Sequence, residues 1–330
     1  MDVVLRRGTL DGSKVTWGEI QVIASENARL CNPVPIIDHQ TNTILLFYKH
    51  FADATIHLTK STDIGETWSS HVNVTQQISE DTDNNIGAFI PGTGNGIQLK
   101  SGRLVLPGYT VERDQSGSIT SFTAGVLLSD DHGNKWYLGG EVPGTTAGGT
   151  KVSTNETAAA LLEDDSICLN SRTSLGKSQP RAQSFSQDGG KTFGPPQLVS
   201  NLIEPKNLCG APAGCSASVL GFQPPDQSPE TWALFSNPAK KVIRCRMSIR
   251  LSRDGCKTWS NPWKIRCCAS GYPSLTQYPA MEVSNPNFAI AYESIAFTRV
   301  KNITFQTFDL NSVIQGTSGC NCCCCCCCCC

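Results

Sequence analysis

The stretch Ser61–Trp68, which reads STDIGETW, decides the fold because the chain repeats it. The pattern S-x-D-x-G-x-x-aromatic returns as SDDHGNKW at 129–136, SQDGGKTF at 186–193 and, with Cys in place of the Gly, SRDGCKTW at 252–259. The copies begin roughly 57 to 68 residues apart, about the size of one propeller blade with its loops. One such octapeptide would be a weak signal, but four at blade-sized intervals predict an all-β propeller.

Each copy has the residues of a β-hairpin turn. The Asp can accept hydrogen bonds from backbone N–H groups ahead of it, and the fifth-position Gly can adopt φ > 0. The aromatic ring then folds back beneath the turn and is buried. Cys256 stands at the fifth position of the fourth copy, so we expect that turn to be distorted. Asp11–Trp17 looks like one more, degenerate copy, and all these turns predict scaffold rather than chemistry.

Length and composition favour one domain. A chain of 330 residues can form one propeller or two ordinary domains, but the repeats run through most of it without a linker. We therefore predict a single propeller over residues 1–315. Apolar runs are short and alternating, as in all-β proteins, and none approaches the length of a membrane span. The net charge of −1 predicts no global attraction to nucleic acid or to an anionic membrane.

Half of the 18 cysteines form the terminal run Cys322–Cys330, whose adjacent residues cannot pair with each other. Residues 316–330 are therefore predicted to be a low-complexity Cys-rich tail, disordered or an artefact of a translated nucleotide repeat. A palmitoylated membrane anchor and a soft-metal tail are the alternatives. The other cysteines have no CxxC pair or His partner, which argues against zinc and fits a reduced, intracellular setting. The start, MDVVLRRG, is not typical of a signal peptide.

Common catalytic signatures are missing from the sequence: H-E-x-x-H, G-x-S-x-G and a Walker loop. The glycine-rich stretch 92–96 precedes a strand-like segment instead of a helix, so it predicts a turn. What remains are polar residues in strand-like surroundings, each of which alone could be a surface ion pair or a solvent-facing side chain. They are Glu156, Arg172, Arg244, Tyr272 and Glu293.

Taken together, these residues resemble those of the exo-α-sialidase (neuraminidase) family over most of residues 3–310. The repeats resemble the Asp-boxes of that family, which is built as a six-bladed β-propeller. The resemblance implies that Tyr272, in GYPSL, is the nucleophile and that Glu156, in NE, assists it; Pro273 replaces the usual Ser of the motif. It also implies that Arg172, in LNSR, and Arg244 are the second and third arginines of a carboxylate-binding triad.

Further positions follow from the same resemblance. Glu293, in the YE pair, matches the residue that braces the first triad arginine. Tyr109 falls where a contact with the substrate glycerol chain is expected, and Asn32, in CNP, resembles a residue lining the acetamido pocket. Arg246 is the less favoured choice for the third arginine. The implied mechanism requires no metal and no cofactor.

The implied residue types suit the substrate. Sialic acid carries a carboxylate on its anomeric carbon, and arginine binds a carboxylate in planar, bidentate fashion. A carboxylate nucleophile would be repelled there, whereas a neutral phenol would not, and sialidases are the tyrosine exception among retaining glycosidases. Because tyrosine has a pKa near 10, it needs a base, which would be Glu156. An Asp would act as the general acid.

The resemblance breaks at the N-terminus. The family pattern places an R-I-P segment with the first triad arginine, and then the acid/base Asp, ahead of an L-R-R-G-like strand. This chain begins at that strand, Val3–Gly8, and Asp2 lies too close to it to be assigned. We therefore expect the chain as written to lack part of its first blade, to have an exposed sheet edge and low solubility, and to be nearly inactive.

The predicted function is retaining hydrolysis of terminal α-linked sialic acids from glycoproteins, oligosaccharides or gangliosides. A non-catalytic Asp-box propeller that binds sialylated glycans or a protein partner is the alternative, and a trans-sialidase would use the same catalytic residues. The set Glu156, Arg172, Arg244 and Tyr272 separates an enzyme from a scaffold, which has no reason to hold all four. A cytoplasmic or membrane-associated location is expected, with the lysosome also open.

Overall fold

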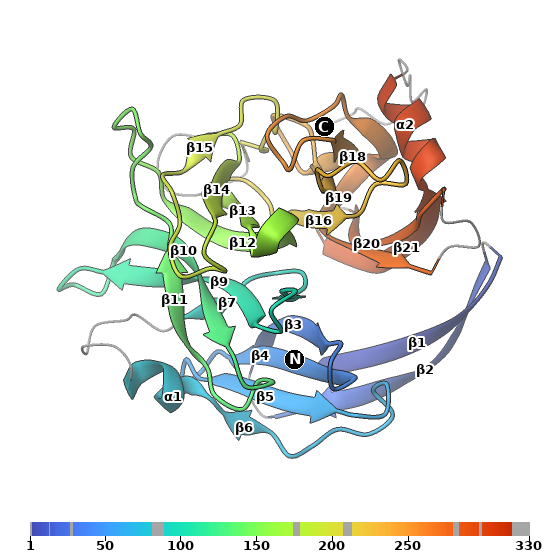
Figure 1. Cartoon of the computed structure of the whole chain (residues 1–330). Helices are drawn as coiled ribbons and strands as arrows, with labels where there is room; N and C mark the ends of the chain where they lie inside the picture. The colour runs from blue at the N-terminus through green and yellow to red at the C-terminus, as the bar shows by residue number, and fades with distance from the viewer. Residues whose placement is uncertain are drawn as a thin grey trace.

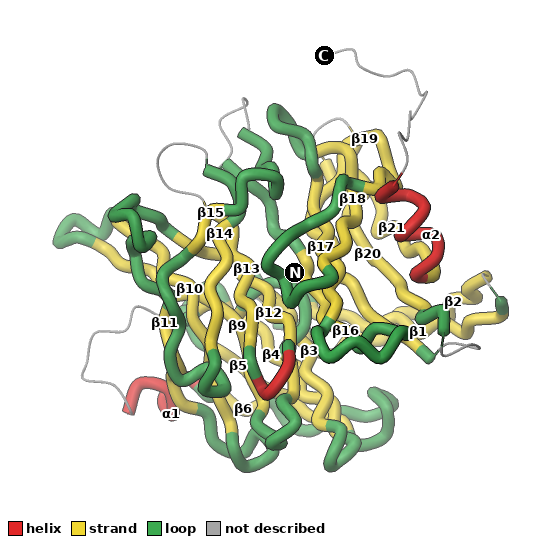
Figure 2. The backbone as a smooth tube through the Cα atoms, turned by 45° about the horizontal axis from the view of Figure 1, so that its top comes forward, coloured by secondary structure: helices red, strands yellow, loops and turns green. Residues whose placement is uncertain are grey.

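The computed structural model describes residues 2–12, 14–26, 29–80, 89–173, 179–206, 213–279, 284–296 and 299–318. Nearly all of the regular structure in these ranges is antiparallel β-sheet, so the predicted all-β class is confirmed. Two α-helices, α1 (Thr75–Glu80) and α2 (Leu310–Ser318), lie at the periphery of the strands (Figure 2). No helix within the described ranges is long and apolar enough to cross a membrane.

The strands form five sheets in chain order. A hairpin comes first, made of β1 (Val3–Asp11) and β2 (Lys14–Ala24). The next sheet contains β3 (Leu30–Asp38), β4 (Thr43–His50), β5 (Ile56–Ser61) and β6 (Val72–Asn73). A five-stranded sheet follows, with β7 (Ile90–Pro91), β8 (Ile97–Gln98), β9 (Leu104–Arg113), β10 (Ile119–Ser129) and β11 (Tyr137–Glu141).

The second half of the chain adds two sheets. One has four strands, β12 (Thr154–Leu161), β13 (Ile167–Thr173), β14 (Ala182–Ser186) and β15 (Gln197–Leu198). The other has six, β16 (Ser218–Phe222), β17 (Trp232–Pro238), β18 (Cys245–Ser252), β19 (Trp263–Tyr278), β20 (Asn287–Ala296) and β21 (Arg299–Asp309). The long strand β19 divides this sheet, since its first half pairs with β18 and its second half with β20.

The sheets follow one another around the molecule, so that the first hairpin and the last strand of the chain approach each other (Figure 1). The contact between them includes Trp17 of β2 and Phe305 of β21, whose ring centroids are 5.3 Å apart in an edge-to-face arrangement. Strands of neighbouring sheets also touch: β3 contacts β7 and β8, and β12 contacts β9 and β16. This arrangement is propeller-like, with four blade-sized sheets that each carry one of the sequence repeats.

The four repeats, named boxes 1 to 4 in chain order, occupy equivalent places. Each begins at the last residue of β5, β10, β14 or β18, which is the third strand in the hydrogen-bonded order of its sheet. In every box the Asp carboxylate accepts a hydrogen bond of 2.9 Å from the backbone N–H four residues ahead. The fifth-position glycines have φ between +75° and +85° in boxes 1 to 3. The predicted turn is therefore confirmed.

Two expectations about these turns were wrong. Cys256 in box 4 adopts φ +68° and its N–H donates to Ser252 Oγ at 3.0 Å, as the glycine N–H does in the other boxes. The turn is not distorted; instead a non-glycine residue is held in the left-handed region, at a cost in strain. Asp11–Trp17 does not fold as a box, because Asp11 pairs directly with Lys14 in the β1–β2 hairpin and Trp17 lies within β2, 40% exposed against Phe305.

Apolar side chains fill the space between successive sheets. The box rings belong to these layers: Trp136 contacts Phe47 of the preceding sheet edge-to-face at 4.8 Å, and Phe193 and Trp259 lie in the next two layers. Trp68 packs less completely, beside the β1–β2 hairpin. The boxes are thus turns that also join one sheet to its neighbour.

Helix α2 covers the six-stranded sheet. Its residues Leu310 and Val313 are buried in the core of that sheet, and Gly316 lies against Trp263. The domain limit predicted after residue 315 falls inside this helix, and the division stays a prediction. The cysteine run 322–330 lies outside the described residues.

Candidate active site

Tyr272 and Glu156 both lie where a strand loses its regular pairing. The register of β19 with β20 shifts between Gly271 and Ser274, and Tyr272 has φ +46°. The register of β12 with β13 shifts between Thr154 and Thr157, on either side of Glu156. Bulges of this kind turn a side chain away from the alternation of the strand and are common beside active sites.

These two irregular strands bring the phenol and the carboxylate together across 116 residues of sequence. The Tyr272 hydroxyl donates to Glu156 Oε1 at 2.8 Å. The second oxygen of the same carboxylate, Oε2, accepts a hydrogen bond from Arg172 Nη1 at 2.7 Å. Glu156 therefore lies between the hydroxyl proton of Tyr272 and the permanent positive charge of Arg172, where its carboxylate can accept that proton.

Arg172 and Arg244 converge on this pair from two sheets. Arg172 is near the end of β13, with a side chain only 5% exposed, and Arg244 immediately precedes β18. The Arg244 guanidinium carbon lies 5.5 Å from the centroid of the Tyr272 ring, within the range of a cation–π interaction. Both arginines are fixed by backbone carbonyl groups: Arg172 Nε donates to Ala213 O at 2.9 Å, and Arg244 Nε and Nη2 donate to Gly214 O at 3.1 and 3.0 Å.

The surroundings keep Tyr272 protonated. Burial is the largest cause that raises the pKa of Tyr272, and the negative charge of Glu156 raises it further, against the opposing charge of Arg172. A phenol in this state is a poor nucleophile on its own and has to transfer its proton as it reacts. Glu156 accepts the hydrogen bond through which that proton would leave.

Of the three remaining predicted residues, Glu293 and Tyr109 lie close enough to Glu156 to be affected by its charge. Glu293 is the strand partner of Gly271; burial raises its pKa, the charge of Arg244 lowers it, and that of Glu156 raises it. Tyr109 on β9 has a raised pKa because of burial and then the charge of Glu156, and it packs edge-to-face on Phe122 at 5.7 Å. Asn32 lies in a bulge of β3 with φ +53°, and its Nδ2 donates to Pro91 O at 2.8 Å.

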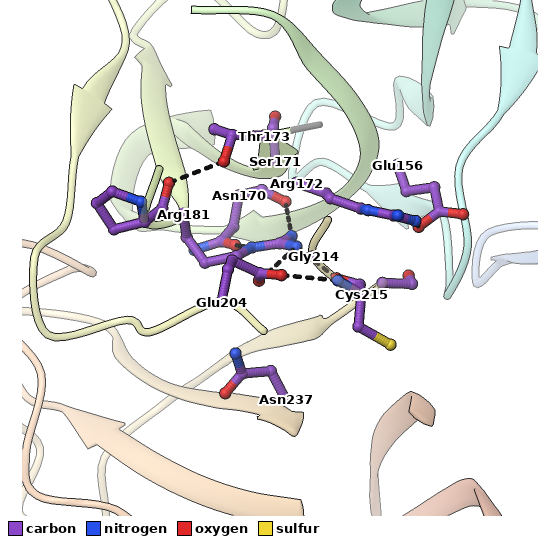
Figure 3. Close-up of polar contacts among 12 residues, drawn as sticks. Glu156, Asn170, Ser171, Arg172, Thr173, Arg181, Glu204, Gly214, Cys215 and Asn237 are labelled. Carbon is purple, nitrogen blue, oxygen red and sulfur yellow. Dashed lines mark hydrogen bonds and ion pairs between the residues drawn. The ribbon is translucent and has the colours of Figure 1, made fainter. Parts of the chain in front are cut away.

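Sequence reasoning missed a second layer beneath these residues. Ala213 and Gly214 carry the carbonyl groups to which the arginines bind, and the Tyr272 N–H contacts the sulfur of the next residue, Cys215 Sγ, at 3.5 Å. Below them lies a fully buried ion pair between Arg181 Nη1 and Glu204 Oε1 at 3.2 Å (Figure 3). None of these residues stands in a motif, and the only available signal was the run of small residues Ala-Gly-Cys-Ser at 213–216 ahead of a strand.

The described side chains also bear on whether the protein could hold a metal ion. Within the described ranges, no group of three or more His, Cys, Asp or Glu side chains could hold a metal ion. The independence from metal and cofactor stays a prediction. What the described residues can do chemically is activate a phenol and bind a carboxylate beside it.

Comparisons with known proteins agree with this geometry. The sequence profile of the BNR repeat-like domain family (BNR_2) matches residues 1–284. Sialidase-4 of Mus musculus is 28% identical over 95% of this chain and 84% of its own length. Two solved structures share the fold: the Hadza microbial sialidase Hz136, with TM-score 0.70 and 24% identity over 90% of this chain and 57% of that chain, and Trypanosoma rangeli sialidase bound to 2,3-difluorosialic acid as a covalent intermediate, with TM-score 0.63 and 17% identity over 92% and 48%.

Proposed function

Because the chain belongs to the BNR repeat-like family and is a glycosidase of the sialidase family, we propose that it is a retaining exo-α-sialidase whose nucleophile is Tyr272. The observation that carries the mechanism is the 2.8 Å hydrogen bond from the Tyr272 hydroxyl to Glu156. A phenol bonded to a buried carboxylate, next to two arginines, is the combination that a glycoside with an anomeric carboxylate requires.

In the proposed reaction, the Tyr272 oxygen bonds to the anomeric carbon while the bond from that carbon to the leaving oxygen breaks. The phenol proton passes to Glu156 Oε1, and the leaving oxygen takes up a proton from a general acid. Water then replaces Tyr272 at the anomeric carbon: it gives one proton to the conjugate base of the general acid, and the phenol regains its own proton from Glu156, so the configuration is retained after two displacements. Arg172 and Arg244 bind the sugar carboxylate throughout.

The proposal extends to the substrates, the number of blades and the location of the protein. Terminal sialic acids of glycoproteins, oligosaccharides and gangliosides are the proposed substrates. A six-bladed propeller is proposed because β19 divides the last sheet in two and the β1–β2 hairpin packs beside β21. A cytoplasmic or membrane-associated location is proposed because the cysteines outside the terminal run are scattered along the sequence without a CxxC pair, which fits a reduced, intracellular setting.

The nucleophile can be tested apart from the general acid. 2,3-Difluorosialic acid loses fluoride, a leaving group that needs no proton, so a covalent adduct depends on Tyr272 and its surroundings alone. We expect the full chain to gain the mass of one fluorosialyl group on the peptide containing Tyr272, and the Tyr272→Phe variant to gain none. The matched control is Tyr278→Phe, at the far end of the same strand, which should label like the wild type.

Two outcomes would contradict the proposal. Labelling of Tyr272→Phe at the wild-type rate would remove Tyr272 from the mechanism. A wild-type chain that binds a sialoside in calorimetry but forms no adduct would favour a non-catalytic propeller that only binds sialylated glycans.

A further inference from the structure

The backbone at Ala213–Cys215 lies at the centre of the site. The carbonyl groups of Ala213 and Gly214 accept hydrogen bonds from Arg172 and Arg244, respectively. The next residue, Cys215, is completely buried and places its sulfur against the Tyr272 N–H. We call this segment, residues 213–215, the arginine hub. Any shift of the hub moves both guanidinium groups, because each is held by it.

The Arg181–Glu204 ion pair is hydrogen-bonded to the arginine hub (Figure 3). Glu204 Oε2 accepts a hydrogen bond of 2.7 Å from the Cys215 N–H, and Arg181 Nη1 donates to Cys215 O at 2.9 Å. Both backbone groups of Cys215 are therefore bonded to the two charged side chains of one pair. The exposed fractions of those side chains are 0% for Arg181 and 1% for Glu204.

The remaining polar groups of Arg181 tie the pair to the strand that carries Arg172. Its Nε donates to Asn170 Oδ1 at 2.7 Å, and its Nη2 donates to Asn170 O at 2.9 Å. Asn170 lies two residues before Arg172 on β13. The pair thus connects the arginine hub to the part of β13 from which the Arg172 side chain extends, and it fixes the hub relative to that strand.

Stability alone is a weak reason for such a pair. Taking two charges out of water is costly, and replacing a buried ion pair by apolar residues of similar volume is often neutral or stabilising. A pair whose other hydrogen bonds go to Cys215 and Asn170, next to two substrate-binding arginines, has a second use. Displacements of about 1 Å in a binding group can lower activity about a hundredfold.

We propose that Arg181 and Glu204 are positioning residues that hold the arginine hub, and through it Arg172 and Arg244, in the geometry that recognises the carboxylate of a sialic acid. The inference rests on the proposed function, since it assigns that carboxylate to the two arginines. It adds a specificity device outside the groups that would touch substrate. Gly214 fits the same reading, because at φ +80° an added Cβ would lie 2.7 Å from Glu204 Oε2 and 2.9 Å from Arg172 Cγ.

The test measures carboxylate preference, defined as the Kd of a methyl ester divided by the Kd of the free acid. The probes are 2-deoxy-2,3-didehydro-N-acetylneuraminic acid and its methyl ester, measured by calorimetry on the full chain. Two double variants share Arg181→Met and differ at one position, Glu204→Leu or Glu204→Gln. The glutamine keeps an acceptor for the Cys215 N–H and carries no charge, whereas the leucine leaves that N–H without one.

We expect the leucine variant to lose carboxylate preference by about tenfold or more, because leaving a buried N–H without its acceptor carries a cost of about this size, and the glutamine variant to retain most of the preference. The control is Arg103→Met with Asp130→Asn, which removes a 2.6 Å ion pair at box 2 and should leave the preference unchanged. A purely structural role would weaken acid and ester equally and leave their ratio at the wild-type value.

Each result decides the inference. Equal preference in the leucine variant and the wild type would overturn the positioning role while leaving the proposed function intact. A wild type that does not prefer the acid would overturn the proposed carboxylate binding, and the positioning role with it. If the double variants do not fold, Gly214→Ala decides in their place: loss of the preference supports the hub, and a wild-type ratio overturns it.

Discussion

The boxes and the active site are built in opposite ways. Each box is a local unit of eight consecutive residues, and the same 2.9 Å hydrogen bond from a backbone N–H to the Asp recurs in all four. The active site occurs once and joins Glu156 to residues 16 and 116 positions away. The difference indicates that each box stabilises its own part of the fold independently of the other boxes. The active site, in contrast, forms only when the strands that carry its residues are all correctly placed.

The largest effect expected from this comparison is at Glu156. Glu156→Gln removes the base that accepts the Tyr272 proton, so we expect the rate of covalent labelling by 2,3-difluorosialic acid to fall by about 10² to 10⁴-fold. The variant also removes a negative charge that raises the pKa of Tyr272, although burial still raises it. The residual rate should therefore increase with pH, as the phenol ionises without help.

A pH–rate profile in the alkaline range, measured on Glu156→Gln and on the wild type, checks this expectation. Glu112→Gln, at an exposed position of β9, is the control for loss of one carboxylate. A residual rate that stays flat with rising pH would show that Glu156 does not serve Tyr272 as a base.

The same contrast explains what the sequence could predict. The box turns were readable because Asp, Gly and the aromatic residue act within eight positions. The family resemblance named Tyr272, Glu156, Arg172 and Arg244, and the structure brings these four together.

The second layer was not readable, because its contacts are long-range and its residues have no fixed spacing. Glu204 reaches Cys215 only after the chain between them has folded around the hub, and the bulges at Glu156 and Tyr272 depend on how neighbouring strands pair. Cys256 failed as a sequence signal for a related reason. Its side chain is completely buried in an apolar layer between sheets, and its backbone has a left-handed φ. The conformational preference of cysteine alone would not predict that φ.

A smaller effect, on stability alone, separates one box from another. Trp136 of box 2 is 1% exposed between two sheets, so Trp136→Ala should lower the free energy of unfolding by about 3–5 kcal/mol. Trp68 of box 1 is only partly buried, and Trp68→Ala should cost about half as much. Urea unfolding of both variants measures the difference. Equal losses would mean that the sheets are not stabilised separately, and loss of Tyr272 labelling in folded Trp68→Ala would show that the boxes also shape the site.

The smallest expected effect is the pH dependence of a single box. Burial acts to raise the pKa of Asp188, but hydrogen bonds from Thr192 and Ser186 outweigh it and lower the pKa to about 2. Since the unfolded value is near 3.9, this carboxylate contributes stability above about pH 4, and the contribution is lost as the pH falls towards 2. The other box aspartates titrate in the same way, so the measurement is the difference between wild type and Asp188→Asn in urea unfolding at a series of pH values from 5 to about 2.5. We expect the difference in free energy of unfolding to shrink as the pH falls. A constant difference would mean that the negative charge of Asp188 contributes nothing to the stability of the box.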